Sequence, residues 1–101
     1  MMKMNLKQLE AWFITGSQHL YGEEVLKQVD SDSREIARAL DKCAGVPVRI
    51  VFKPVLTSPE AIRTICREAD NAEQCVGLIT WMHTFSPAKM WIAGLKSLSK
   101  P

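Results

Sequence analysis

The sequence predicts an α/β fold, built as a three-layer open sheet of parallel strands. Three short apolar segments rich in β-branched and aromatic residues alternate along the chain with three segments of helical period. The apolar segments are nearly continuous rather than alternating, which is typical of strands buried on both faces. With 101 residues, 47% hydrophobic and 24% charged, the chain has the size and balance of one globular domain covering residues 1–101.

The first strand is predicted at residues 9–15, LEAWFIT. A helix is expected after it, because apolar residues recur there at an average spacing close to the helical 3.6. The polar run DSDS at 30–33 leaves two alternatives open: one helix, or a short helix followed by a second one capped near Ser31 or Ser33. The residues expected to share the buried face are Val25, Val29, Ile36, Leu40 and Cys43.

The second strand is predicted at residues 46–55, VPVRIVFKPV, which are dense in β-branched side chains. Gly45 and Pro47 are expected to end the preceding helix. Glycine accepts the left-handed conformation of a helix cap, and proline cannot continue the helical hydrogen bonds.

The next helix is predicted to begin at Ser58, Pro59 and Glu60. Serine accepts a hydrogen bond from a free N–H, proline has no N–H to leave unpaired, and the acid interacts favourably with the helix dipole. The expected buried stripe consists of Ile62, Ile65, Cys66 and Ala69.

The third strand is predicted at residues 75–82, CVGLITWM, and the third helix is predicted to start at Ser86 and Pro87. Helical spacing places one set of its residues inward and its lysines outward. The inward set is Trp91, Gly94, Leu95 and Leu98, and the outward set is Lys89, Lys96 and Lys100.

This alternation, with right-handed crossovers, favours a flavodoxin-like sheet with strand order 2-1-3. The third strand would then lie at an edge, and its apolar LITW sequence would favour pairing with another chain. Because a fourth strand is expected after the last helix, we interpret the chain as an incomplete domain, truncated before that strand.

Charge and cysteine content narrow the function classes. The net charge of +2 is spread without clusters, so the sequence does not indicate nucleic-acid binding. No segment has the apolar length of a signal peptide or membrane span, so a cytoplasmic location without membrane partners is expected. Cys43, Cys66 and Cys75 have no metal-ligand spacing and apolar neighbours, so they are expected to be reduced packing residues.

Two loops are the candidates for function, because ligands of this fold bind beyond the carboxyl ends of the strands. They are GSQHLYGEE after the first strand and WMHTFSPAKMW at the end of the third. In the first, Gly16 and Gly22 lack the spacing of phosphate-binding motifs, and Glu23 and Glu24 would repel a phosphate.

Neutral polar and aromatic groups remain in these loops, and they suit an uncharged polyol. Amides and hydroxyls can donate and accept hydrogen bonds with sugar hydroxyls, while a flat ring can cover the C–H face of a sugar. His19 and His83 each lack a second ligand at one-turn spacing, so a metal site is disfavoured. The structural alternative is that Tyr21 and Phe85 simply cover the top of the sheet.

Three stretches carry a closer resemblance: WFITGSQHLYGEEVLKQV, VFKPVLTSPEAI and WMHTFSPAKMWIAGL. They resemble the N-terminal domain of the L-arabinose isomerases, which interconvert L-arabinose and L-ribulose. The similarity runs from about residue 9 to the end of the chain. QHLYG and HTFSPAKMW are its most specific parts.

The resemblance implies an aldose–ketose isomerase with a longer, three-domain subunit that assembles with sister subunits as a hexamer. It also implies a divalent metal, usually Mn²⁺, held by two glutamates and two histidines from later in the polypeptide. Such a metal polarises the sugar's oxygens while hydrogen moves between C1 and C2. This chain alone is therefore expected to bind no metal, to contain no catalytic residue and to be inactive.

Carried over position by position, the resemblance assigns four residues to the sugar pocket. Gln18, Leu20 and Tyr21 would contribute from the first loop and Phe85 from the second. The alternative function is a non-catalytic flavodoxin-like module that binds a sugar or a partner subunit by itself.

Overall fold

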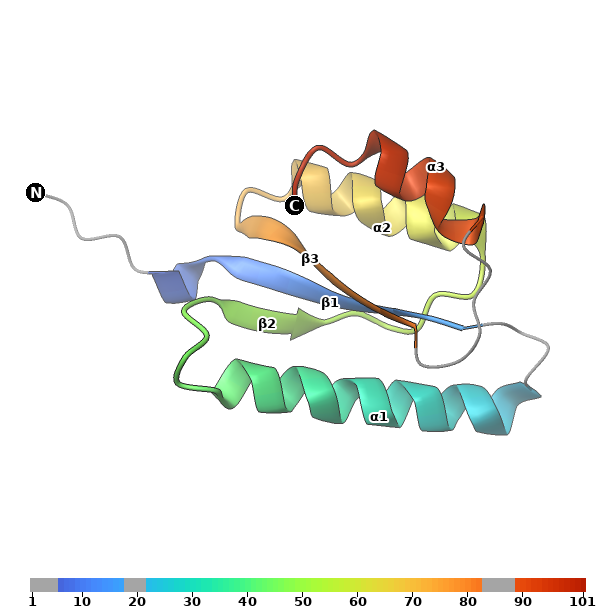
Figure 1. Cartoon of the computed structure of the whole chain (residues 1–101), viewed down its shortest axis with the longest axis horizontal. Helices are drawn as coiled ribbons and strands as arrows, with labels where there is room; N and C mark the ends of the chain where they lie inside the picture. Colours follow the sequence, from blue (N-terminus) through green and yellow to red (C-terminus); the bar gives the residue numbers. More distant parts are fainter. Residues whose placement is uncertain (1–5, 18–21, 83–88) are drawn as a thin grey trace, which may run out of the picture.

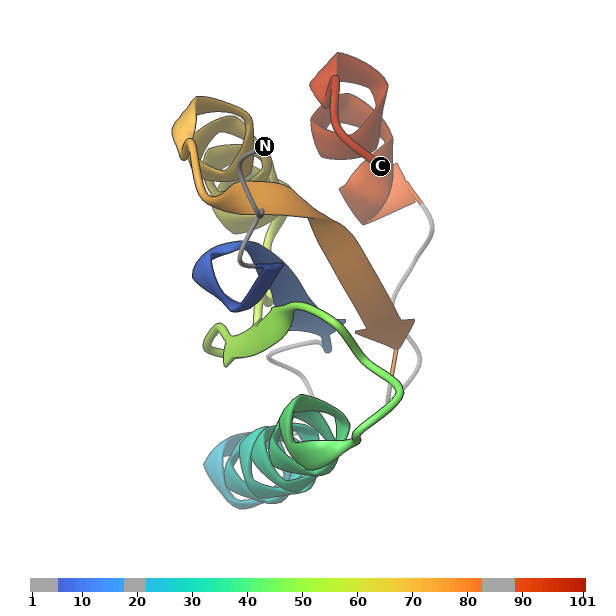
Figure 2. The same ribbon diagram turned by 90° about the vertical axis from the view of Figure 1, so that its left-hand side faces the viewer.

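The computed structural model describes residues 6–17, 22–82 and 89–101. Three parallel strands form a single sheet, with α2 and α3 on one face and α1 on the other (Figures 1 and 2). This arrangement confirms the predicted three-layer α/β fold. The elements in chain order are η1 (Leu6–Gln8), β1 (Glu10–Gly16), α1 (Gly22–Lys42), β2 (Arg49–Phe52), α2 (Pro59–Asn71), β3 (Cys75–Met82) and α3 (Lys89–Ser97).

The strand order is β2-β1-β3, as predicted for a flavodoxin-like sheet. β1 is the central strand, and it pairs in parallel with β2 from Glu10↔Arg49 to Phe13↔Phe52. Its register with β3 shifts between Glu10 and Ala11 and then runs without a break to Gly16↔Met82. All three strands therefore point their carboxyl ends toward the same edge of the sheet.

The core is divided between the two faces of the sheet. Toward α2 and α3, the largest buried side chains are Trp12 and Trp91, which pack with Ile14 and Ile62. Toward α1, the buried cluster is smaller and consists of Phe13, Ala37 and Ile50. The first face therefore holds most of the buried apolar surface.

Helix α1 is continuous, which resolves the open alternative in favour of one helix. Its central polar residues pair with side chains or carbonyls one turn away instead of capping a new helix. The Gln28 amide donates to Asp32 at 2.8 Å, and the Ser33 hydroxyl donates to the Val29 carbonyl at 2.7 Å. Because these partners lie within the helix, the DSDS run does not interrupt it.

The buried face of α1 differs in part from the predicted one: Val29 is buried as predicted, and Leu40 is half-buried. Val29, Ser33 and Ala37 are buried, whereas Val25 and Ile36 are 40% and 37% exposed. Small side chains let the helix approach Phe13 and Ile50, and the internal hydrogen bond of Ser33 removes most of the cost of burying a hydroxyl. Apolar periodicity alone did not identify this face, because Ser33 counts as polar in such a pattern.

The end of α1 also differs from the prediction. The helix ends at Lys42, so Cys43 lies beyond it and is exposed, which contradicts its assignment as a packing residue. Gly45 lies in a turn and does not adopt a positive φ; among the described residues only Gly22 does, at 84°.

The other two cysteines, Cys66 and Cys75, are buried and free as expected. Burial raises the pKa of the Cys66 thiol, and the charge of Asp70 raises it further.

Strand β2 is shorter than the predicted 46–55. The regular ladder ends where the Lys53 N–H donates to the Phe13 carbonyl at 3.1 Å. Alternation would make Val55 the next donor to β1, but no bond from Val55 follows among the described residues. Pairing with β1 resumes only at Leu56, whose N–H donates to the Thr15 carbonyl at 2.8 Å.

Helix α2 agrees with the prediction in its start and its buried stripe. The Ser58 hydroxyl accepts from the Ala61 N–H at 3.1 Å, and Pro59 occupies the first turn. All four expected inward residues are buried: Ile62, Ile65, Cys66 and Ala69.

In α3, Trp91 and Gly94 are buried as predicted, but Leu95 is 42% exposed and Met90 is buried in its place. A Cβ at Gly94 would lie 3.0 Å from the Ile62 Cγ2, so the two helices approach closely at this glycine. That contact fixes the rotation of α3 and leaves Leu95 at the surface.

Lys100 was expected to face outward, but its Nζ donates to the carbonyls of Ala69 at 2.7 Å and Ala72 at 2.6 Å. These are carbonyls at the end of α2, where the helix dipole favours a cation. The neighbouring Asp70 carboxylate accepts from the Ser99 N–H at 3.1 Å and the Ser99 hydroxyl at 3.0 Å. Together these bonds tie Ser99 and Lys100 to α2.

The edge of β3 was expected to be unprotected, and it is covered at one point. The Leu78 N–H donates to the Pro101 carbonyl at 2.7 Å. Gly77 makes this approach possible, because a Cβ there would lie 2.7 Å from the Pro101 oxygen. None of the helices within the described ranges has the length and apolar character needed to cross a bilayer.

Candidate functional site

The candidate site lies at the carboxyl ends of the strands. β1 ends at Gly16 and β3 ends at Met82, and these two residues are partners in the parallel ladder. The segments that follow them therefore leave neighbouring strands at the same level, as expected for the two candidate loops. The four predicted pocket residues, Gln18, Leu20, Tyr21 and Phe85, lie outside the described residues, as do His19 and His83.

The described residues at this end of β1 are fully buried. Thr15 and Ser17 are both 0% exposed, and the Ser17 N–H donates to the Leu56 carbonyl at 3.0 Å. The Thr15 Oγ1 has no hydrogen-bond partner among the residues that the structure describes. Gly22 opens α1 at a φ of 84°, a conformation that favours glycine.

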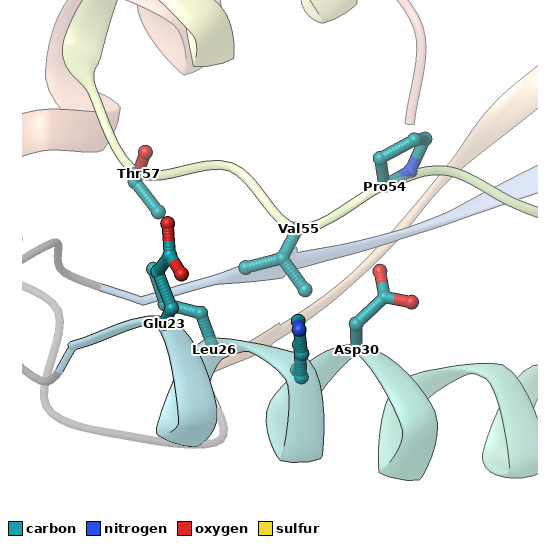
Figure 3. A pocket seen from close by; sticks show the side chains of 7 residues that line it. Glu23, Leu26, Asp30, Pro54, Val55 and Thr57 are labelled. Carbon is teal, nitrogen blue, oxygen red and sulfur yellow. The ribbon is translucent and has the colours of Figure 1, made fainter.

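A cavity of about 460 Å³ lies beside this end of the sheet, between α1 and the segment that joins β2 to α2. Figure 3 shows Val55 pointing from that segment toward α1, where Leu26 and Asp30 face it. The residues that line the cavity are Glu23, Leu26, Lys27, Asp30, Pro54, Val55 and Thr57.

This lining combines charged groups with an apolar floor. Glu23, Lys27 and Asp30 lie on one side of α1, at spacings of four and three residues. Leu26 and Val55 supply apolar surface next to them. Carboxylates accept from hydroxyls, an ammonium donates to them, and apolar side chains pack on C–H groups, so the cavity can accommodate a small polyhydroxylated molecule.

The sequence interpretation missed this cavity. It treated Glu23 and Glu24 only as acids at the helix start that would repel a phosphate. Two features of the sequence pointed to the cavity. Glu23, Lys27 and Asp30 recur on one flank of the helix, and Thr57 is a polar residue in the segment that faces this flank. Recognising it required knowing that residues 54–57 pack opposite that flank.

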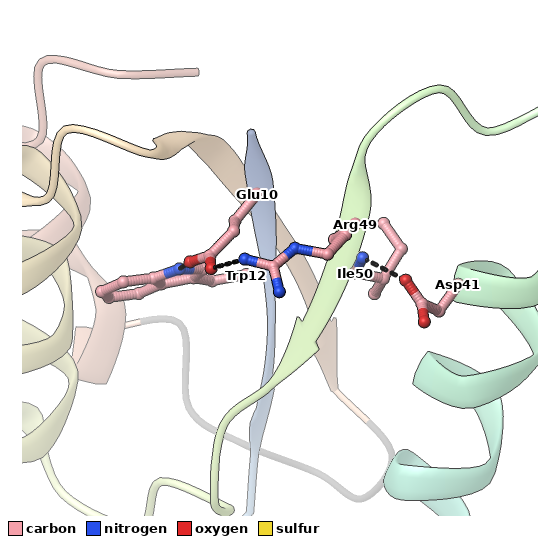
Figure 4. A network of polar contacts seen from close by, with 5 residues as sticks. All are labelled: Glu10, Trp12, Asp41, Arg49 and Ile50. Carbon is pink, nitrogen blue, oxygen red and sulfur yellow. Dashed lines mark hydrogen bonds and ion pairs between the residues drawn. The ribbon is translucent and has the colours of Figure 1, made fainter. Parts of the chain in front are cut away.

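A second cavity, of about 640 Å³, lies at the opposite, amino-terminal end of the strands. Its cation, Arg49, is already engaged, because its guanidinium forms an ion pair with the Glu10 carboxylate. Glu10 also accepts from the Trp12 Nε1 at 3.0 Å (Figure 4). On the other side of β2, the Asp41 carboxylate accepts from the Ile50 N–H at 2.8 Å. These contacts join β1, β2 and α1, which indicates a structural role for this end.

Within residues 6–17, 22–82 and 89–101, no three His, Cys, Asp or Glu side chains lie close enough to hold a metal ion. Manganese, which the resemblance implies, therefore does not fit the described part of this chain.

Comparison with known proteins connects the chain with sugar isomerases. The profile of the L-arabinose isomerase N-terminal domain matches residues 5–101. The L-arabinose isomerase of Koribacter versatilis is 64% identical over 98 residues, covering 97% of this chain and 20% of that protein. The same name and coverage apply to relatives from Herpetosiphon aurantiacus, at 61% identity, and Geobacillus thermodenitrificans, at 59%. The chain thus spans about a fifth of the length of these relatives.

Proposed function

The chain belongs to the family of L-arabinose isomerase N-terminal domains, and from this premise we propose that it serves as the N-terminal part of an enzyme that interconverts L-arabinose and L-ribulose. In this role it shapes the pentose pocket with the loops that follow β1 and β3. The remaining part of the isomerase, about four-fifths of its length in the relatives, supplies the chemistry.

The observation that carries this proposal is the pairing of Gly16 with Met82. Because of this pairing, the two sugar-pocket loops begin side by side at the edge of the sheet where ligands of this fold bind. Gln18, Leu20 and Tyr21 contact the sugar from one loop, and Phe85 covers it from the other. These residues bind and orient the pentose and exclude water from it.

In the complete enzyme, a divalent metal supplies the polarisation of the sugar's oxygens. Its ligands come from the remaining polypeptide. The enzyme works in the cytoplasm as an assembly of sister subunits.

A chimera tests the proposal. Residues 1–101 of this chain replace the corresponding fifth of the Koribacter versatilis isomerase, whose matched segment is 64% identical. With Mn²⁺ present, the chimera is expected to convert L-arabinose to L-ribulose, and the 101-residue chain alone is expected to convert none. A folded but inactive chimera, or turnover by the short chain, would refute the proposal.

A further inference from the structure

The segment that follows β2 contains one more residue than the part of β1 that it faces. Between the pair Phe13↔Phe52 and the bridge Gly16↔Leu56, β1 advances by three residues, from 13 to 16, and the facing segment advances by four, from 52 to 56. This spacing is that of a β-bulge, in which one extra residue on one strand stays unpaired.

The backbone hydrogen bonds show the same irregularity. In a regular parallel ladder every second residue donates to the neighbouring strand, so Val55 would donate after Lys53. Instead, the Leu56 N–H donates to the Thr15 carbonyl at 2.8 Å. The N–H of Val55 makes no hydrogen bond to any residue that the structure describes, so the bulge lies at Pro54 and Val55.

The directions of the side chains agree with this assignment. The Lys53 Nζ lies 3.9 Å from the centroid of the Trp12 ring, which belongs to the buried cluster toward α2 and α3. Regular alternation would place Val55 on this same face. Val55 instead points toward α1 (Figure 3), and Leu56 joins the cluster that contains Trp12. The bulge therefore places Leu56 against the end of β1.

Leu56 fixes the backbone at the start of the first candidate loop. The Ser17 N–H donates to the Leu56 carbonyl at 3.0 Å, and Ser17 is fully buried. Gly16, the preceding residue, pairs with Met82 on the other side of β1. Only four residues separate Ser17 from Gly22, where α1 begins, so a displacement of Ser17 also displaces the residues of this loop.

We propose that Leu56 is a positioning residue for the isomerisation, because its backbone bonds to Thr15 and Ser17 hold the first loop where its side chains meet the pentose. This inference rests on the proposed function, which places Gln18 and Tyr21 in the pentose pocket. β-Bulges recur next to active sites, where they redirect side chains. A displacement of about 1 Å at a group that orients the substrate can lower the rate about a hundredfold, so Leu56 affects turnover without touching the sugar.

Amide hydrogen exchange of the 101-residue chain, followed by NMR, tests the bridge without any enzyme activity. After correction for intrinsic exchange rates, we expect the Ser17 and Leu56 amides to exchange at least about tenfold more slowly than the Val55 amide. Equal protection of the three amides would overturn the proposal, because Ser17 would then not be held by Leu56.

The kinetics of the chimera test the effect on the pentose site. Leu56→Pro removes the N–H that bonds Thr15, and it is expected to lower kcat/KM for L-arabinose at least about tenfold. Val48→Pro is the matched control just before β2, because the Val48 N–H makes no hydrogen bond within the described ranges. We expect this control to keep kcat/KM within about twofold of the parent chimera.

A double variant separates positioning from a general loss of structure. If Leu56 acts through the first loop, Leu56→Pro lowers kcat/KM less than about threefold in a Tyr21→Ala background, because the two losses are then not additive. An equal loss in both backgrounds, or full activity of the Leu56→Pro chimera, would overturn the proposal. An inactive parent chimera would instead refute the proposed function, and amide exchange would still decide whether Leu56 holds Ser17.

Discussion

Gly16 and Met82 face each other across the β1–β3 ladder, each at the last position of its strand. Neighbouring parallel strands lie about 4.8 Å apart, so the segments that follow these two residues start side by side. Two loops separated by more than sixty residues in the sequence can therefore act on one small ligand.

Gly94 allows α3 to approach α2, and Gly94→Ala is expected to destabilise the chain. The new Cβ would lie 3.0 Å from the Ile62 Cγ2 and 3.1 Å from the Cys66 Sγ. Overpacking of this kind costs about 1–3 kcal/mol, and the better helix propensity of alanine offsets about 1 kcal/mol of that cost. Urea unfolding followed by tryptophan fluorescence measures the change.

Gly45→Ala is the matched control for this substitution. A Cβ at Gly45 would meet no atom within 4 Å, and the residue has no positive φ, so alanine there is expected to be neutral or to stabilise by up to about 1 kcal/mol. If both alanine variants were as stable as the parent chain, the close contact between α2 and α3 would be wrong.

Asp70 is expected to make stability depend on acidic pH. Desolvation raises the pKa of its carboxyl, but the hydrogen bonds from Ser99 and Lys100, with the Lys100 charge, together hold the pKa below its usual value. Since the unfolded carboxyl binds its proton at higher pH than the folded one, the stabilisation is present above about pH 4 and is lost as pH falls.

The measurement is thermal unfolding of the parent chain and Asp70→Asn between about pH 3 and pH 7. We expect the parent to be more stable above about pH 5 and the difference to shrink toward pH 3. A difference that stays constant over this range would show that the carboxylate charge does not stabilise the residues that follow α3.

Thr15→Val is expected to preserve or increase stability. The Thr15 side chain is fully buried, and its hydroxyl lacks a partner among the described residues. Replacing the hydroxyl with a methyl group of similar shape removes a desolvation cost of about 1 kcal/mol. Thr64→Val, on the exposed side of α2, serves as the control. A loss above about 1 kcal/mol at Thr15 would mean that the hydroxyl is hydrogen-bonded.

The sequence predicted those elements whose limits are set by residues that are neighbours in the chain. The start of α2 at Ser58 and Pro59 follows from capping chemistry. The limits of β3 follow from a continuous apolar run. The strand order follows from the rules for parallel crossovers, which depend little on individual side chains.

Features that depend on contacts between elements were not predictable in this way. Ser33 is buried although it is polar, because its hydroxyl donates to the Val29 carbonyl within α1. Leu95 is exposed because Gly94 sets the rotation of α3. Lys100 folds back onto carbonyls 31 and 28 residues away in the sequence. The cavity beside α1 likewise requires the packing of residues 54–57. The four sugar-pocket residues remain a prediction.

The most direct test of the central claim is the kinetics of the chimera with Tyr21→Ala or Phe85→Ala, compared with Ile92→Ala on the exposed surface of α3. Loss of a ring that covers the sugar is expected to lower kcat/KM for L-arabinose at least about tenfold, equivalent to about 1.4 kcal/mol, while the control stays within about twofold. If both loop variants kept the kcat/KM of the parent chimera, these loops would not line the pentose site.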